Sequence, residues 1–320
     1  FALLEMLDAR KDVHLYIALL EDLADLHFKI NEGVHAIPIY LEALQLWRGL
    51  TGADTWIAVR LQRKIGETVT SMNKFADYQR FAATARSSLE GGLALVQDQA
   101  PHPETIRLLR ILSRDAWYVA SSADWDKAER YAQSAVAMAE QVESPDELSS
   151  ALEALAIVYS ARGLYRENVE VCLRRLELSR DPHFTDYRER VNIHYQLGRA
   201  LLAVGDYETA LTHAAEAERL SAAIQDITTQ VNAMTLQSQC LFPLDRWDDL
   251  IAMDEKLKEI QARNTFERLG IAMCFHTALH SAVMTLRGEH EKAGALREES
   301  YGIMIALAGP PEGWSRNQYY

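Results

Sequence analysis

The sequence has few cysteines, no long hydrophobic run and an excess of acidic over basic residues. Its three cysteines, Cys172, Cys240 and Cys274, lie far apart in a chain of 320 residues, which excludes the disulfide framework of a small secreted domain. No segment reaches the roughly 18–20 apolar residues that a membrane-spanning helix needs. No charged and then apolar leader opens the chain. These features predict reduced thiols, a cytoplasmic location and no membrane partner.

The charge balance argues against binding to nucleic acid. The chain has 46 acidic and 33 basic residues and a formal net charge of −13, whereas phosphate backbones are bound by basic surfaces. Its apolar fraction of 48% and charged fraction of 25% are typical of a folded soluble protein.

Motifs that carry known chemistry are also missing from the sequence. It has no phosphate-binding loop, no glycine-rich dinucleotide turn, no nucleophile elbow and no H-E-x-x-H zinc motif. We therefore predict that this region is not an enzyme and has no catalytic residue and no cofactor.

The best candidate for a metal site is the segment CFHTALH. It places His276 and His280 four residues apart, on one side of a helix, with Cys274 nearby. A zinc ion would need three or four such ligands. The alternative is that His280 lies on the helix-packing face and His276 lies at the surface. The ligand count favours this alternative, and we predict no metal site.

A turn followed by a helix recurs along the chain. It is clearest in LAVGDYETALTHAAEAERL, residues 202–220, where Gly205 precedes Tyr207 by two residues and Ala210 follows three residues later. Glycine accepts the positive φ that a helix end requires, and alanine permits close helix contact. Segments similar to this one occur at 29–47, 71–89, 120–138, 160–178, 242–260 and 285–303.

Each of these segments is preceded, about a dozen residues upstream, by the apolar stripe of an amphipathic helix. In HYQLGRALLAVG the apolar residues recur at helical spacing, and Gly198 lies among them; Gly66 has the same place in LQRKIGETVTSMN. A small residue on such a stripe lets a second helix approach closely. The repeating element is therefore a helix, a tight turn and a second helix. It recurs every 40–43 residues or so, with one longer step near 91–103.

The pattern Leu-Gly, Gly-Asp-Tyr, Ala, Ala at 197–214 resembles the tetratricopeptide repeat (TPR). The resemblance implies an all-α fold, a right-handed superhelical solenoid of about seven helix-turn-helix repeats. Residues 1–16 would be the end of a preceding repeat, and residues 17–320 a single array. The repeats would start near residues 17, 59, 109, 149, 191, 231 and 274, with an incomplete repeat from about 312. Neither end resembles a polar capping helix. We therefore expect the array to continue into further domains of a longer chain, or an end to be covered by a partner or by a second copy.

In TPR folds the first helix of each pair lines a concave groove, so the resemblance also points to groove residues. The helical register assigns to it Arg60, Arg63, Glu67, Arg110, Ser113, Arg114, Trp117, Asn192, Tyr195, Gln196, Arg199, Asn232, Thr235 and Gln239. Arginine suits carboxylates and phosphates, whereas Asn, Gln and Tyr pair with the backbone of an extended peptide. Alternatively, Arg60, Arg63, Arg110 and Arg114 pair with the protein's own excess of acids and with helix C-termini.

The leading hypothesis is a non-catalytic scaffold or sensor arm that binds a protein or peptide partner in the groove. The long repeats resemble those of bacterial multidomain signalling ATPases and LuxR-type regulators, which implies a role in signal transduction or transcription regulation. The second hypothesis is a sensor of a peptide or an acidic small molecule, whose binding shifts the superhelix.

Overall fold

The structure, a computed structural model, describes residues 12–308 except 31, 73–74, 119–122 and 264–268. These residues form fourteen α-helices, and no strand occurs among them. None of the described helices is long and apolar enough to cross a membrane. The helices are α2 (Val13–Lys29), α3 (Gly33–Arg48), α4 (Thr55–Thr70), α5 (Phe75–Val96), α6 (Pro103–Tyr118), α7 (Trp125–Val142), α8 (Pro145–Ala161), α9 (Tyr165–Leu178), α10 (Tyr187–Ala203), α11 (Tyr207–Ala223), α12 (Ile227–Leu241), α13 (Trp247–Arg263), α14 (Leu269–Leu286) and α15 (His290–Ala308).

The chain divides into two compact units, Phe1–Val158 and Tyr159–Tyr320, called unit 1 and unit 2 below. In unit 1, α2 packs against α3, α4 against α5 and α6 against α7. In unit 2, α10 packs against α11, α12 against α13 and α14 against α15. Each unit has its own apolar core, built around residues such as Tyr40 and Leu61 in unit 1 and Leu250 and Met273 in unit 2.

The first helix of each hairpin begins four to six residues before the repeat start that the apolar pattern suggested. The reason is capping. The side chains of Asp12, Asp54 and Asp226 each accept a hydrogen bond from a backbone N–H of the first turn, and such caps extend a helix beyond its apolar stripe. Pro103 and Pro145 are the first residues of α6 and α8, where proline is favoured because it has no N–H to leave unpaired.

The turns within the hairpins have the expected geometry. Gly163, Gly205 and Gly288 have φ angles of 76°, 83° and 77°. Asp245 takes the same place before α13 with a φ of 56°, and aspartate is one of the few other residues that tolerates this conformation. The aromatic residue that follows, such as Tyr207, is the first residue of the second helix. Asn73, which takes the place of this glycine in the segment 71–89, lies outside the described residues.

Small residues separate the paired helices, as the sequence predicted. Ala36, Ala128, Ala210 and Ala293 have no solvent exposure. A Cβ atom on Gly198 would lie 3.3 Å from the backbone oxygen of Ala210. The alanines and Gly198 therefore set the distance between the helices in these hairpins, whereas Tyr78, Asn168 and Leu250 take the alanine position in the other three.

Candidate functional site

The predicted groove residues of unit 1 lie on α4 and α6, two first helices that pack against each other. We call the surface formed by the charged residues of α2, α4, α6 and α8 the inner face of unit 1. The pairing of its charges decides what this face can bind.

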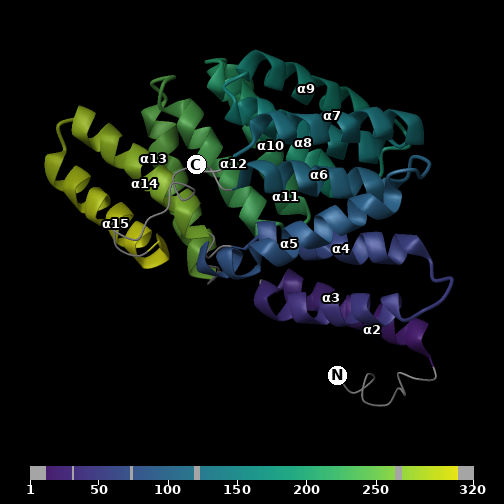
Figure 1. Cartoon of the computed structure of the whole chain (residues 1–320). Helices are drawn as coiled ribbons and strands as arrows, with labels where there is room; N and C mark the ends of the chain where they lie inside the picture. Colours follow the sequence, from purple (N-terminus) through teal and green to yellow (C-terminus); the bar gives the residue numbers. More distant parts are fainter. Residues whose placement is uncertain (1–11, 31, 73–74, 119–122, 264–268, 309–320) are drawn as a thin grey trace. The chain divides into compact units, whose positions relative to one another are not determined.

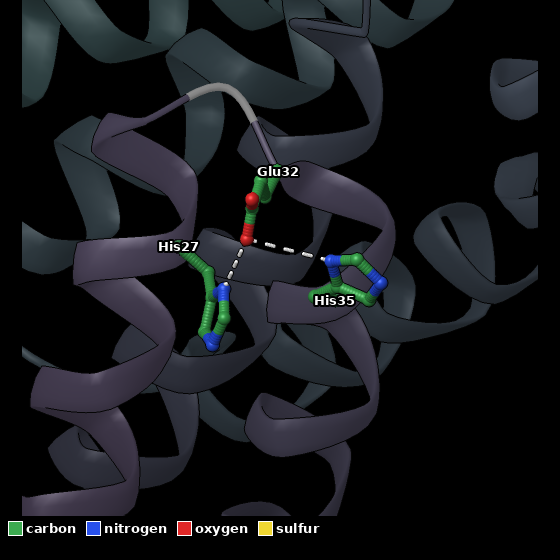
Figure 2. A group of neighbouring side chains, drawn as sticks. All are labelled: His27, Glu32 and His35. Atoms are coloured by element: carbon green, nitrogen blue, oxygen red, sulfur yellow. Dashed lines mark hydrogen bonds and ion pairs between the residues drawn. The ribbon is translucent and has the colours of Figure 1, made fainter.

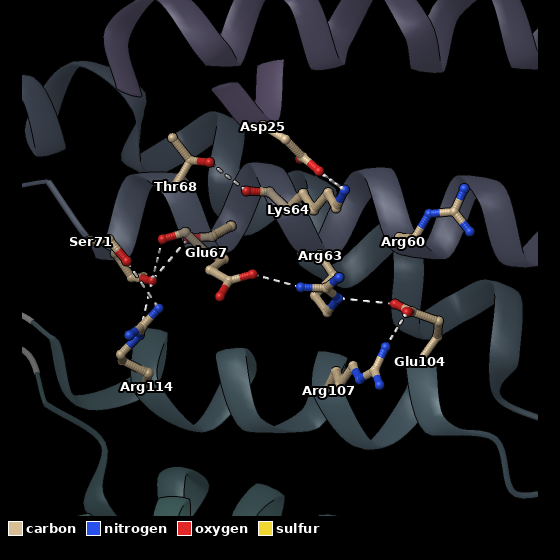
Figure 3. A network of polar contacts seen from close by, with 12 residues as sticks. Asp25, Arg60, Arg63, Lys64, Glu67, Thr68, Ser71, Glu104, Arg107 and Arg114 are labelled. Carbon is tan, nitrogen blue, oxygen red and sulfur yellow. Dashed lines mark hydrogen bonds and ion pairs between the residues drawn. The ribbon is translucent and has the colours of Figure 1, made fainter. Parts of the chain in front are cut away.

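Between α2 and α4 the charges are paired in the structure. Nε and Nη2 of Arg60 donate to the two carboxylate oxygens of Glu21 at 2.7 and 2.9 Å. The ammonium group of Lys64 lies 2.7 Å from Oδ2 of Asp25; Figure 3 shows Lys64 reaching toward this carboxylate. Burial alone would raise the pKa of Glu21, but the hydrogen bonds from Arg60 and Lys64 outweigh it and hold this pKa below its ordinary value.

The same pairing continues from α4 to α6 and from α6 to α8. Arg63, which is only 9% exposed, donates through Nε to Glu104 at 3.0 Å, as Figure 3 shows. Arg107 pairs with Glu147, and Nη2 of Arg110 donates to Glu153 at 3.0 Å.

These pairs join residues 39 to 43 positions apart, which is one repeat. Each pair therefore links a first helix to the first helix of the next hairpin. The pairing offsets most of the arginine charge on this face, as the alternative interpretation of the sequence expected.

Arg114 on α6 differs from the other arginines of the inner face. Its Nε donates to the hydroxyl of Thr70 at 3.1 Å and its Nη2 to that of Ser71 at 3.3 Å. These two hydroxyls are neutral, so the guanidinium charge is offset only by the carboxylates of Glu67 and Glu153, which do not hydrogen-bond to it in the described structure. Burial lowers the pKa of Arg114, although a guanidinium group stays protonated in proteins.

A small pocket of ≈100 Å³ lies beside Arg114, lined also by Arg110, Trp117, Glu153 and Ile157. The half-buried Trp117 ring lies nearly parallel to that of Trp125, with their centroids 6.2 Å apart. Four residues assigned to the groove from sequence, Arg110, Ser113, Arg114 and Trp117, thus line one cavity that offers a cation and an aromatic wall.

The predicted groove residues of unit 2 lie on α10 and α12, which also pack against each other. Asn192 donates to Glu189 at 3.5 Å, and the guanidinium of Arg199 lies 5.9 Å from the ring centroid of Tyr195. Asn232 and Gln239 are half-buried on α12. The structure thus places these residues on neighbouring first helices, as the register predicted.

Two residues that the register placed in the groove are buried instead. Ser113 donates to the carbonyl of Ala128 within its own hairpin at 2.8 Å. Thr235 donates to the carbonyl of Ala272 on α14 at 3.2 Å. Their hydroxyls therefore satisfy helix backbone groups and are not part of an exposed surface.

Two histidine sites were missed from the sequence because their members are not joined by any motif. On α10 and α11, Nδ1 of His194 lies 3.0 Å from Nδ1 of His213, at an open hollow of ≈700 Å³. Burial lowers the pKa of both rings, and the neighbouring His213 lowers that of His194 further.

The second missed site lies at the turn between α2 and α3, where Oε2 of Glu32 is 2.8 Å from Nδ1 of His27 and 3.5 Å from Nδ1 of His35. Figure 2 shows both rings turned toward this oxygen. The hydrogen bond with His27 lowers the pKa of Glu32. The site is largely exposed, because the side chain of His35 is 68% accessible.

The expectation that His276 lies at the surface is wrong, because this residue has no solvent exposure. It lies near His280, as the spacing predicted, and near Asp254 of the preceding helix α13. Cys274 is not part of this group, since its thiol donates to the carbonyl of Ser300. Both histidines lie on the buried face of α14. This face is wider than the sequence pattern indicated.

Comparisons with known proteins agree with this architecture. The sequence profile of the tetratricopeptide repeat matches residues 151–183. No curated protein matches the chain in sequence.

Solved structures match most of the chain at low identity. One is the signal transduction ATPase with numerous domains (STAND) protein with a tetratricopeptide repeat sensor from Pyrococcus horikoshii, with 12% identity and a TM-score of 0.68; the match covers 92% of this chain and 43% of that one. A Rap protein complexed with competence and sporulation factor matches with 13% identity and a TM-score of 0.61, over 91% of this chain and 77% of that one. Aspartyl phosphate phosphatase F from Bacillus subtilis matches with 13% identity and a TM-score of 0.59, over 94% and 74%.

These matches confirm the predicted fold, an all-α solenoid of TPR-like hairpins. The chain spans less than half the length of the STAND protein.

Proposed function

We propose that the chain is a non-catalytic interaction arm that binds an extended segment of a protein partner along the inner face of unit 1. The pocket beside Arg114 carries this proposal. It would hold one side chain of the bound segment, with a carboxylate against the Arg114 guanidinium and an apolar group against Trp117.

The size of this pocket favours a peptide over a free small molecule. Its ≈100 Å³ is about a third of the smallest volume usual for a drug-sized ligand, ~300 Å³. An extended peptide needs only shallow pockets for single side chains, since its affinity is spread along the chain.

The pairing of charges along the inner face also bears on the second hypothesis. A sensor of a strongly acidic ligand needs unpaired cations, whereas Arg60, Arg63 and Arg110 each contact a carboxylate of the protein. Moving these arginines to a ligand would leave behind the buried Glu21 and Glu104 and the half-buried Glu153, at a cost of roughly 1–3 kcal/mol for each lost charged hydrogen bond. For Arg114 the exchange costs less, because its Nε and Nη2 donate to neutral hydroxyls.

The structural neighbours support the same class of function. The Rap structure holds the competence and sporulation factor, and the STAND protein has its repeats as a sensor. By analogy of fold, we place this chain in a bacterial multidomain signalling or transcription regulator, in the cytoplasm, with further domains in the full-length protein. The groove residues of unit 2, Asn192, Tyr195, Arg199, Asn232 and Gln239, would bind the backbone of a partner segment there.

A random-peptide display library tests the proposal even while the partner is unidentified. Peptides selected on the wild-type chain are measured against Arg114→Gln and Trp117→Ala. Loss of a charged hydrogen bond, roughly 1.5–3 kcal/mol, predicts about a 10- to 100-fold weaker affinity for Arg114→Gln.

The matched control is Arg219→Gln, which removes an exposed arginine that pairs with Glu216 on α11. It should leave peptide affinity unchanged. If selected peptides bind the Arg114 and Trp117 variants as tightly as the wild type, the pocket is not the binding site.

A further inference from the structure

Two histidines and one aspartate of unit 2 face each other within its core. Oδ1 of Asp254 on α13 lies 3.5 Å from Nε2 of His276 and 3.8 Å from Nδ1 of His280, both on α14. The three residues are 6%, 0% and 8% exposed. The three atoms lie within 4.8 Å of one another.

Both facing ring nitrogens lack a hydrogen-bond partner in the described structure although they are buried. The distances of 3.5 and 3.8 Å exceed those of N–H···O hydrogen bonds, about 2.7–3.2 Å. Buried polar atoms in proteins almost always have a hydrogen-bond partner, so each of these two nitrogens requires a physical explanation.

The tautomer of His276 is set by its second nitrogen. Nδ1 of His276 lies 2.8 Å from the hydroxyl of Ser238, and this hydroxyl donates to the carbonyl of Met234. With the hydroxyl hydrogen on the Met234 carbonyl, Ser238 accepts from Nδ1–H of His276. In the neutral ring, Nε2 then presents a lone pair toward the carboxylate of Asp254.

A lone pair that faces a carboxylate in a buried site is repelled unless a cation lies between them. The other carboxylate oxygen of Asp254 is held by Lys258, whose ammonium group lies 2.7 Å from Oδ2. Oδ1 is thereby left to face the two imidazoles.

We propose that Asp254, His276 and His280 form a binding site for a divalent transition-metal ion of the zinc type. Two imidazoles and one carboxylate are a common ligand set for such ions. Tetrahedral coordination with metal–ligand distances of about 2.0–2.1 Å places ligand atoms ~3.3 Å apart. The two distances from Asp254, 3.5 and 3.8 Å, need to contract by only a few tenths of an ångström, and the two ring nitrogens lie within 4.8 Å of each other.

The surroundings have the features of a metal site's outer shell. Ser238 orients His276 and Lys258 orients Asp254, which is the role that hydrogen-bond partners of metal ligands usually have. Since Asp254 belongs to the sixth hairpin and both histidines to the seventh, a bound ion would tie these two hairpins of unit 2 together. The three protein ligands leave at least one coordination position for water or a partner's ligand.

The exposed group His27, Glu32 and His35 is a second place where an added ion could bind, so the experiment must separate the two. The whole chain is stripped with a chelator and titrated with Zn²⁺ by calorimetry, and with Co²⁺ as a spectroscopic probe. The main test uses His35→Gln, which alters an exposed side chain and leaves the core of unit 2 unchanged.

We expect His35→Gln to bind one equivalent of Zn²⁺ and to give the visible absorption of tetrahedral Co²⁺. Adding His280→Gln should weaken this binding at least tenfold, with circular dichroism confirming that the metal-free double variant is folded. Should the double variant unfold, His35→Gln alone still tests the proposal. If His35→Gln binds no metal ion, the proposal is overturned. A proton shared between Asp254 and the histidines would then explain their arrangement. Equal binding by the folded double variant overturns it as well.

Discussion

Gly66 on α4 gives the sharpest test of how the hairpins pack. A Cβ atom at this position would lie 2.4, 2.6 and 2.9 Å from three side-chain carbons of Leu89 on α5. Carbon atoms in contact are normally about 3.5–4.0 Å apart. Leu89 has no solvent exposure, so its side chain cannot swing into water. Gly66→Ala therefore forces Leu89 off its rotamer or pushes the two helices apart.

The cost of Gly66→Ala follows from two opposing effects. Overpacking of this kind costs typically about 1–3 kcal/mol, whereas replacing glycine by alanine within a helix gains roughly 0.8–1.0 kcal/mol. The net effect on the free energy of unfolding should be a loss of up to ~2 kcal/mol. In a Leu89→Ala background the clash is gone, and Gly66→Ala should stabilise the chain by up to ~1 kcal/mol.

A double-mutant cycle measured by urea denaturation checks this change of sign. The wild type, both single variants and the double variant are compared by far-ultraviolet circular dichroism, with hydrogen exchange of α4 and α5 as a local probe, because repeat arrays need not unfold in one step. An equal effect of Gly66→Ala in both backgrounds would show that residues 66 and 89 are not in contact.

Three other changes test different parts of unit 2. Arg175→Ala removes a fully buried guanidinium that pairs with a carboxylate of α10 at 2.8 Å and should cost about 3–5 kcal/mol in a denaturation experiment; a loss below about 1 kcal/mol would argue against a buried pair. Because the pKa values of His194 and His213 are lowered on folding, the unfolded state binds more protons, so the melting temperature should fall as the pH drops below about 6.5. His213→Gln should flatten that pH dependence, and an unchanged slope would contradict the assignment. Ala210→Phe should destabilise by about 1–3 kcal/mol through overpacking, while Ala215→Phe at an exposed position of α11 should have little effect on the same melt.

Most of the fold could be predicted from the sequence, because the packing of each hairpin depends on local sequence patterns. Gly205 and Tyr207 mark a turn with positive φ, and Ala210 follows at the distance that faces the first helix. These residue types follow directly from backbone and steric requirements. The helix starts were misplaced by a few residues, because capping residues such as Asp54 lie outside the apolar stripe.

The candidate site beside Arg114 could be predicted only in part. The register brought Arg110, Arg114 and Trp117 to one face, and the structure gathers them at one pocket. The sequence could not tell which arginines have carboxylate partners, because those partners lie about one repeat away and depend on side-chain reach. For the same reason the sequence could not predict that Asp254 lies beside the histidines of α14. The spacing of His276 and His280 places them on one face of the helix, but it does not identify the residue of the neighbouring helix that they contact.

A peptide that binds the inner face of unit 1 beside Arg114 should slow hydrogen exchange there. Hydrogen exchange of the whole chain with and without a peptide selected from the library measures this most directly. We predict slower exchange in α4, α6 and α8, with α5 and α7 unchanged. Protection confined to α5 and α7, or found only in unit 2, would contradict it.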